Sequence, residues 1–370
     1  MGRHAVIDSQ GHASLLADEP GTRLGRGAAG WLVAMFVGIM ISALMGLIHV
    51  PYAVVKPGPV RNTLGNGPEG KPLITVEGKA TYPTTGALDF TTVEVYGGPS
   101  SPVNVWDLVI GQFDEASTVV PEEELFPKGV SGEEVAHESA AEMADSQQEA
   151  IAAALRGLGE KVPEIVTINA LTKGSPATGV LRGGDVLVSI DGTPVSTPDA
   201  VRAAIRAHKP GERVVLTVRR AGKQEVLTVT TAESEGRAVV GVLLRSAFDF
   251  PIKVSINAGE VGGPSAGMMF SLAVYDKLTP GALTGGVNIA GTGTIDSAGT
   301  VGRIGGIRQK LVGAKRGGAT WFLAPAQNCD QVVGHIPDGL QVVKVATFAQ
   351  ARDAVKGIGT KQTASLPRCT

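Results

Sequence analysis

Cysteine is scarce in this sequence, and the patterns that mark metal or nucleotide sites are missing. Only Cys329 and Cys369 occur among 370 residues, too few and too badly spaced for a Cys-rich zinc site. Six histidines are scattered without an HExxH pattern, so a metal-dependent mechanism has no support and we predict no metal and no other cofactor. The phosphate-binding pattern GxxxxGK[ST] does not occur either, which predicts no bound nucleotide.

A large excess of charge of either sign is also lacking. The net charge is −2 and there is no long basic run, so we predict no nucleic-acid partner.

The two cysteines leave two alternatives open. In an oxidising compartment they can form one disulfide that ties the C-terminal tail to the body, and two free thiols fit the sequence equally well. The length and the 43% of hydrophobic residues suffice for two or more domains with their own cores.

One long apolar run stands near the N-terminus. Residues 30–50 contain no Asp, Glu, Lys or Arg, and this length suits a membrane-spanning helix with Trp31 and Tyr52 at the two interfaces. A secretory signal peptide is the rival interpretation. The run is longer than a usual h-region and no clean A-x-A site follows it, so we predict an uncleaved anchor. Basic residues flank both ends and leave its orientation open. Residues 1–29 are predicted to be a disordered tail.

The next part of the chain carries strand and helix patterns. Residues 51–70 are rich in Pro and Gly and are predicted to form an extended exit from the membrane. Alternating, β-branched residues predict strands at 73–78 and 86–96, which we expect to pair with each other. Residues 119–131 are predicted to be an exposed loop. Apolar residues at helical spacing predict a helix over residues 132–158.

Residues 166–231 have a different pattern, in which short strands alternate with turns and helices. This stretch contains GSPATGVLRGGDVLVSIDGTPV and a helix pattern at 197–207, and its order is predicted as strand, short helix, strand, turn, helix, strand, hairpin, strand. Asp191 and Gly192 form a strong hairpin signal. This stretch closely resembles a bacterial PDZ domain, which implies a groove that binds an extended peptide as an added strand. A PDZ-like fold used only for packing is the alternative.

Ser265 is the candidate nucleophile. The GGP sequence before it predicts a turn and the apolar spacing after it predicts a helix, so Ser265 should lie at the N-cap or in the first turn, where free backbone N–H groups gather. A capping serine is the commoner explanation of such a position. Gly263 and Gly267, however, let a substrate carbonyl approach, and the backbone around Gly263 and Ala266 is predicted to support the site by stabilising an oxyanion.

A serine nucleophile needs a base, and two candidates exist. GPSAG fits the G-x-S-x-G elbow of α/β-hydrolases, which would use His335 with Asp296 or Asp330, but the residues before Ser265 indicate a loop and not the strand that this elbow requires. The other candidate is Lys310, which has apolar residues three positions before it and one and four positions after it. It should therefore lie on the apolar face of a helix, where burial would lower its pKa and leave it neutral.

A family resemblance favours the lysine. GGPSAG followed by TGTIDSAGTVGRIGGIRQK resembles the proteolytic domain of Lon proteases, whose pattern contains GPSAG, TGEI and GxVxxIGGxxxK. The resemblance implies Ser265 as nucleophile, Lys310 as general base, and Thr292 as a supporting residue that forms a hydrogen bond near the lysine. The sequence departs from the pattern at two positions: Gly262 stands where an acidic residue is frequent, and Thr294 replaces the glutamate of TGEI. Both departures bear on the hydrogen bonding around the lysine.

The resemblance extends beyond the motifs. TGALDFTTVEV and MADSQQEAIAAALRG resemble the strand and the helix that precede the serine in Lon domains, so the PDZ domain is expected to be inserted within the protease fold. After the lysine, two apolar runs predict buried strands, and residues 348–355 are predicted to form a closing helix.

The chain as a whole resembles membrane-bound, PDZ-containing Lon-like proteases of bacteria. This implies an α+β fold: a Lon-type proteolytic domain, ribosomal protein S5 domain 2-like, with an inserted PDZ domain and one N-terminal transmembrane helix. The expected segments are a tail (1–29), a transmembrane helix (30–50), two parts of the protease (51–160 and 236–356), the PDZ domain (161–235) and a C-terminal tail (357–370).

The function implied by this resemblance is that of a membrane-anchored, ATP-independent serine endopeptidase. Its protease and PDZ domains would lie outside the cytoplasm, on a single-pass anchor in the cell membrane, and its partners would be exported peptides or proteins. A homo-oligomer is compatible with a family that includes Lon-type rings, and the oligomeric state stays open. The alternative from another class is a PDZ-based binding scaffold whose Lon-like domain is inactive.

Overall fold

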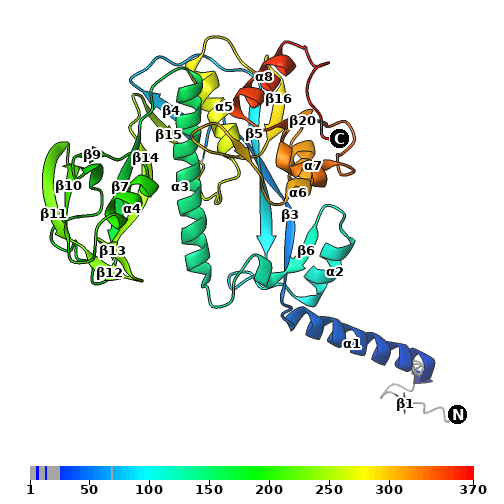
Figure 1. The fold of residues 1–370 in the computed structure, drawn as a ribbon. Helices are drawn as coiled ribbons and strands as arrows, with labels where there is room; N and C mark the ends of the chain where they lie inside the picture. Colours follow the sequence, from blue (N-terminus) through cyan, green and yellow to red (C-terminus); the bar gives the residue numbers. More distant parts are fainter. Residues whose placement is uncertain (1–5, 8–12, 15–25, 68–69) are drawn as a thin grey trace.

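The computed structural model describes residues 6–7, 13–14, 26–67 and 70–370 (Figure 1). The tail expected over residues 1–29 lies mostly outside the described residues, apart from a short pairing of β1 (Val6–Ile7) with β2 (Ala13–Ser14). Helix α1 spans Arg26–Leu47. Residues 26–29 therefore belong to the helix and not to the tail, since arginine and alanine, three of these four residues, are good helix formers.

Helix α1 ends before the predicted boundary at residue 50. The backbone N–H of Val50 donates to Val103 O, and Pro51 cannot continue a helix. Residues Gly30–Leu47 have a mean hydropathy of 2.1 and none of them is buried. The helix is thus long and apolar enough to cross a membrane, a criterion that a signal sequence near the N-terminus also meets.

The chain after α1 builds a sheet of six strands, in the order β20-β19-β16-β5-β3-β6 among the described residues. β5, β16, β19 and β20 run parallel, and β3 is antiparallel to both of its neighbours. The segment predicted as an extended exit from the membrane thus forms β3, a strand inside the sheet. The strand bounds are β3 (Tyr52–Asn62), β5 (Ala87–Tyr96), β6 (Thr118–Pro121), β16 (Asn288–Gly291), β19 (Trp321–Pro325) and β20 (Gln341–Val345).

The predicted pairing of the two early strands is wrong. β4 (Ile74–Glu77) pairs with β15 (Lys253–Ile256), which follows the PDZ domain. β5 pairs with β3 on one edge and, over residues 87–90, with β16 on the other. The alternation of residues predicts that a strand exists, but it does not identify the partner.

Helices cover both faces of the six-stranded sheet. α3 (Gly132–Gly157), α5 (Gly267–Leu278) and α8 (Phe348–Gly359) pack with sheet residues such as Phe90 and Leu323 in the largest core. α6 (Ile307–Arg316) and α7 (Cys329–Val332) cover the other face through Ile307, Leu311 and Phe322. The predicted helix at 132–158 is confirmed. The predicted loop at 119–131 instead begins with β6 and a 3₁₀ turn, Glu122–Glu124.

The PDZ region forms a separate body on the other side of α3, in green at the left of Figure 1. Its sheet has the order β11-β10-β8-β7-β14, with β9 beside β8, and its core is independent of the protease core. Its elements are β7 (Glu164–Leu171), β8 (Val186–Ile190), β9 (Thr193–Pro194), α4 (Pro198–Arg206), β10 (Arg213–Arg220), β11 (Lys223–Thr230), β12 (Ala232–Ser234), β13 (Arg237–Val239) and β14 (Val242–Phe248).

Two details of the PDZ prediction need correction. The short helix expected after the first strand is a series of turns at residues 176–180. The boundary expected at residue 235 is too early, because β14 adds to this sheet beside β7 and the chain returns to the protease body only afterwards. β14 satisfies the hydrogen-bonding edge that β7 would otherwise expose to solvent. In the chain, the strands of this sheet lie between α3 and β15.

The C-terminal segment is held to the body. Cys329 and Cys369 form a disulfide, which decides between the two alternatives that the sequence left open. Lys344 N also donates to Pro367 O at 2.9 Å. Helix α8 continues to Gly359, four residues beyond the predicted end at 355. The tail therefore packs along β20 through defined contacts.

Candidate active site

Ser265 lies in the turn directly before α5. Gly263 has a φ of 80°, which favours glycine, and Pro264 then leads into the helix. The N-cap residue is Ala266, and no side chain caps this helix end. Ser265 therefore does not serve as a capping serine. Its half-buried hydroxyl instead accepts a hydrogen bond from Lys310 Nζ at 2.7 Å.

Lys310 reaches the serine from α6. This helix begins after Gly306, which adopts a left-handed conformation (φ 67°), and its apolar residues Ile307 and Leu311 pack against the sheet. Because Lys310 shares that inward face, its side chain is only 2% exposed. Lys315, further along the same helix, is exposed to solvent. The predicted placement of the two lysines is confirmed.

Three neutral oxygens surround the Lys310 amine. Nζ lies 2.7 Å from Ser265 Oγ, 3.1 Å from Thr292 Oγ1 and 3.0 Å from the backbone oxygen of Thr91. Burial lowers the pKa of Lys310 to about 7. A neutral amine has two N–H donors and one lone pair. It can therefore donate to Thr292 and Thr91 while its lone pair faces the serine hydroxyl.

Thr292 also fastens the serine backbone. Its hydroxyl donates to Ser265 O at 2.9 Å, and the N–H of Gly293 donates to the same oxygen at 2.8 Å. Thr292 is fully buried, and its own N–H is held by Leu323 O. The hydrogen bond between this threonine and the lysine, expected from the TGTI sequence, is thus present, and the same hydroxyl contacts the Lys310 amine and the Ser265 backbone.

The backbone N–H groups differ in their availability. Gly263 N donates to Ser139 O at 2.9 Å, so this glycine shapes the turn and does not point a free N–H at a substrate. The N–H groups of Ser265 and Ala266 have no hydrogen-bond partner within the described part of the chain. They stand at the start of α5, where backbone donors and the helix dipole favour negative charge. These two groups are suited to receive an oxyanion.

A cleft of about 290 Å³ leads to this pair of side chains. One wall is the far half of β5. The adjacent strand β16 pairs with β5 only over residues 87–90, so in the described structure residues 91–94 show an open edge to the cleft. The exposed carboxylates Glu94 and Glu260 are part of its lining. An extended peptide fits such an edge by adding a strand.

The hydrolase-elbow alternative is not supported by the geometry. His335 is exposed, and its Nδ1 lies 3.1 Å from Val333 O. Asp330 pairs with Arg303 at 2.9 Å, and Asp296 accepts from Thr300 N at 2.7 Å. The strand before the serine, β15, ends at Ile256, so a loop and not a strand leads into Ser265. Within the described residues, no hydrogen bond or ion pair joins His335 to the serine.

Sequence reasoning missed two contributors to the site. Thr91 supplies its backbone oxygen to Lys310, and every residue has such an oxygen, so no sequence signal could have found it. Ser146 of α3 donates from Oγ to Pro264 O at 2.9 Å and thereby holds the turn before Ser265. Ser146 is buried on a helix whose small residues face α5, a weak signal that was readable from the spacing.

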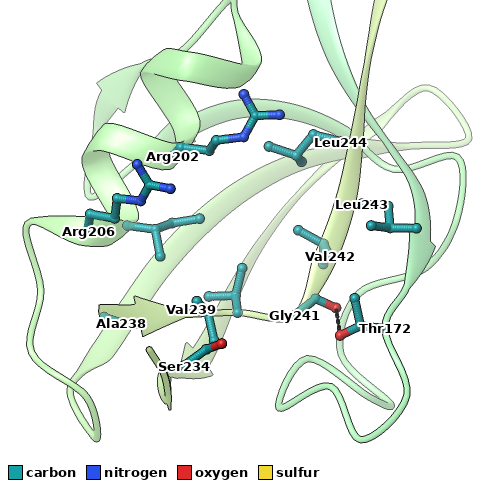
Figure 2. Close-up of a pocket in the computed structure, with 12 residues that line it drawn as sticks. Thr172, Arg202, Arg206, Ser234, Ala238, Val239, Gly241, Val242, Leu243 and Leu244 are labelled. Carbon is teal, nitrogen blue, oxygen red and sulfur yellow. Dashed lines mark hydrogen bonds between the residues drawn. The ribbon is translucent and has the colours of Figure 1, made fainter. Parts of the chain in front are cut away.

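The PDZ region contains a groove of its own, of about 420 Å³, shown in Figure 2. On one side stands α4, from which Arg202 and Arg206 project; on the other lie Val242 and Leu244 of β14. β14 is the edge strand of its sheet, so one of its edges is not paired in the described structure. Gly241 has a φ of 67°, and a Cβ there would lie 2.8 Å from Ser175 Oγ, so the turn at the groove end requires glycine.

Comparison with known families finds two domains, and the second match includes β14, which pairs with the PDZ sheet in the structure. Residues 141–231 match the model of the PDZ domain, and residues 242–356 match the Lon protease (S16) C-terminal proteolytic domain. The chain therefore carries a PDZ domain and a Lon-type proteolytic domain. The PDZ match begins inside α3, whereas the sheet of this domain starts with β7.

Relatives with curated names are Lon proteases. The chain is 38% identical over 93 residues to the Lon protease of Clostridioides difficile, covering 25% of this chain and 11% of that protein. It is 33% identical over 147 residues to the Lon protease of Azospirillum brasilense, covering 37% and 18%. Lon protease 2 of Bacillus subtilis is 29% identical over 108 residues, covering 29% and 19%. The chain thus spans less than a fifth of the length of these relatives. The matched domain and these relatives support a serine peptidase.

Among solved structures, the PDZ domain of an SdrC-like protein from Listeria innocua is 26% identical. The match covers 22% of this chain and 92% of that one, with a TM-score of 0.21.

Proposed function

We propose that this chain is a membrane-anchored serine endopeptidase that uses a Ser265–Lys310 dyad without ATP. The observation that carries the proposal is the 2.7 Å hydrogen bond between a half-buried serine hydroxyl and a buried lysine whose pKa is lowered to about 7. A serine hydroxyl becomes nucleophilic when a neighbouring base accepts its proton, and a lysine serves as that base only when it is neutral. At pH 7 about half of the molecules would have this form.

The reaction would proceed by acyl transfer. Lys310 takes the proton as Ser265 Oγ attacks the scissile carbonyl, and the free N–H groups of Ser265 and Ala266 receive the oxyanion. The protonated lysine then gives its proton to the leaving amine, which departs and leaves an ester on Ser265. A water molecule attacks that ester with Lys310 again as the base, and the regenerated hydroxyl closes the cycle.

Thr292 and Thr91 would act as positioning groups for the lysine. Their oxygens hold two of its protons in both protonation states, so the third position of Nζ always faces Ser265 Oγ. The hydrogen bonds from Thr292 Oγ1 and Gly293 N to Ser265 O orient the nucleophile from the other side. This arrangement needs no histidine.

The PDZ groove would select the substrate. A peptide added to β14 beside α4 would be held by backbone hydrogen bonds, and the rest of the polypeptide would reach the cleft that Met143 of α3 helps to line. Two features favour a location outside the cytoplasm: the apolar helix α1 and the Cys329–Cys369 disulfide, a bond that persists in oxidising compartments. Exported peptides and proteins are therefore the proposed substrates.

The test is cleavage of an unfolded protein by the full chain in nanodiscs, with and without ATP. Ser265→Ala and Lys310→Ala should abolish cleavage, while Lys315→Ala, a lysine on the exposed face of the same helix, should retain it. ATP should have no effect. Loss of activity in His335→Ala with activity kept in Lys310→Ala would overturn the dyad. A wild-type chain that binds peptides but cleaves none would favour the alternative function, a PDZ-based scaffold.

A further inference from the structure

Helix α2 presents large apolar side chains to the outside of the molecule. It spans Val105–Phe113 and is closed at its start by a capping box between Asn104 and Asp107. Its inner face packs on β3 at Gly111, where a Cβ would come within 2.9 Å of Val54. Its outer face consists of residues at the i, i+3, i+4 and i+7 positions: Trp106, Val109, Ile110 and Phe113, exposed by 39%, 37%, 58% and 84%. We call these four residues the α2 face.

The α2 face is unusual for a surface in water. The apolar residues of an amphipathic helix normally turn inward, and four together on the outer side of a nine-residue helix form a contiguous patch. Gln112, a polar residue of the same helix, lies beside this face. Scattered single apolar residues need no explanation, but a patch of this kind marks a surface that another apolar phase covers.

The neighbour of this patch is the candidate membrane helix. Trp106 Nε1 donates to the backbone oxygen of Ser42 in α1 at 2.9 Å, and the indole also lies over Gly46. A bridge between His49 and Asn104 joins the end of α1 to the start of α2. Figure 1 shows α2 at the end of the body from which α1 leaves. The α2 face therefore continues the apolar surface of α1.

The position of the contact between Trp106 and Ser42 along α1 indicates that lipid covers the α2 face. Ser42 lies inside the apolar window Gly30–Leu47, five residues before its end. This corresponds to about 7.5 Å along a helix at 1.5 Å per residue. Interfacial helices bury their apolar face to a depth of about 5–10 Å, and tryptophan is enriched at that level. Trp106 would thus lie at the boundary between headgroups and acyl chains.

We propose that α2 is a membrane-surface helix whose apolar face inserts into the outer boundary of the bilayer beside α1. The inference rests on the proposed membrane anchorage. Helix α2 contains Asp107 and no Lys or Arg, and Asp114 and Glu115 follow it directly, so the helix itself offers no cation to an anionic headgroup and favours a zwitterionic lipid surface. Because α2 packs on β3, its insertion would hold the protease sheet at a defined height and tilt.

The experiment measures how deep single side chains lie in the full chain reconstituted in phosphatidylcholine nanodiscs. The two native cysteines are joined in a disulfide, so a spin label attaches to one introduced cysteine. The variants are Phe113→Cys on the α2 face, Gln112→Cys beside it on the same helix, Val37→Cys in α1 and Glu235→Cys in the exposed β12–β13 turn. The relaxation rate of each spin label is then measured with oxygen, which partitions into lipid, and with a water-soluble nickel complex.

The expected result is a graded depth. The label at 37 should be accessible to oxygen and not to nickel, the label at 113 should show at least a severalfold higher oxygen-to-nickel ratio than the label at 112, and the label at 235 should be aqueous. A label at 113 as aqueous as that at 235, with 37 still in lipid, overturns this inference and leaves the anchorage standing. An aqueous label at 37 overturns the anchorage itself. Protection of 113 from both reagents also overturns the inference, because it indicates a protein surface such as a second copy of the chain.

Discussion

The cleft at Ser265 and the PDZ groove place their candidate functional groups in opposite environments. Lys310 is 2% exposed and its three hydrogen-bonding partners are supplied from distant parts of the chain. The groove instead presents an unpaired strand edge, and the two arginines of α4 stand over it in solvent. The proposed chemistry requires burial because only burial makes the lysine neutral, whereas the proposed peptide recognition requires unsatisfied backbone groups that a peptide can complete.

The two regions also differ in charge. The cleft carries the exposed carboxylates Glu94 and Glu260, and the groove carries Arg202 and Arg206. Arg202 is paired with Asp199 on the same helix at 2.7 Å, while Arg206 has no ion pair in the described structure. A substrate with acidic side chains near its docking end and basic side chains near its cleavage site would complement both. If the two sites are separate units, changes in one should leave the other intact.

The largest expected effect is a loss of catalytic rate on substitution of Lys310, with peptide binding unchanged. Lys310→Met removes the base while it retains an apolar side chain of similar length, so kcat should fall by roughly a thousandfold or more. The affinity of the PDZ groove for a peptide should stay unchanged, as measured by calorimetry with the same preparation. Lys315→Met is the matched control. Parallel loss of peptide affinity in Lys310→Met would show that the two regions are not independent.

The second prediction concerns pH. With a pKa of about 7, Lys310 is protonated below that value and cannot accept the serine proton. The rate kcat/KM should therefore rise with pH and level off above about 7, and it should fall roughly tenfold for each unit below. Peptide binding at the groove should not follow this curve. A rate that keeps rising to pH 10 would mean that burial does not lower the lysine pKa.

An intermediate effect is expected at Thr292. Thr292→Val removes the hydroxyl that bridges Lys310 and Ser265 O while it preserves shape, so kcat should decrease by roughly one to two orders of magnitude with KM nearly constant. Thr292→Ser retains the hydroxyl and should recover most of the rate. If the serine variant is as slow as the valine variant, packing and not the hydrogen bond explains the loss.

A smaller effect is expected at the end of the groove. Gly241→Ala places a Cβ 2.8 Å from Ser175 Oγ at a φ of 67°, so the turn beside β14 must shift, at a cost of about 1 kcal/mol or more. Peptide affinity should fall about fivefold or more, and cleavage of a short peptide that bypasses the groove should be unaffected. Gly236→Ala is the control: its φ is 74° and nothing lies within 4 Å of its Cβ position.

The smallest effect is expected from charge. Arg206→Glu reverses an exposed charge beside the groove, so peptides with acidic side chains should bind severalfold more weakly at low salt, and the difference should shrink as salt is added. Arg237→Glu, on the nearby strand β13 but outside the groove lining, serves as control. Equal effects of the two substitutions would indicate a general field and not a groove contact.

Sequence reasoning performed well where the signal was local. The helices around Ser265 and Lys310 follow from apolar spacing, and the GPSAG and IGGIRQK motifs located both residues. Sequence reasoning did not predict which strands pair with each other. β4 pairs with β15 across the whole PDZ domain, and β14 joins the PDZ sheet although it lies outside the expected boundary. Alternating patterns carry no information on which distant edge is free.

The sequence by itself determined that a serine would lie near a helix start and that a lysine would lie on an apolar helix face. Only the tertiary structure decided that these two side chains meet at 2.7 Å. It also supplied the Thr91 oxygen, 219 positions from Lys310 in the chain, and the burial that lowers the lysine pKa to about 7. The physical reason is that periodicity records which way a side chain faces on its own element, whereas a pKa depends on what all other elements pack against it.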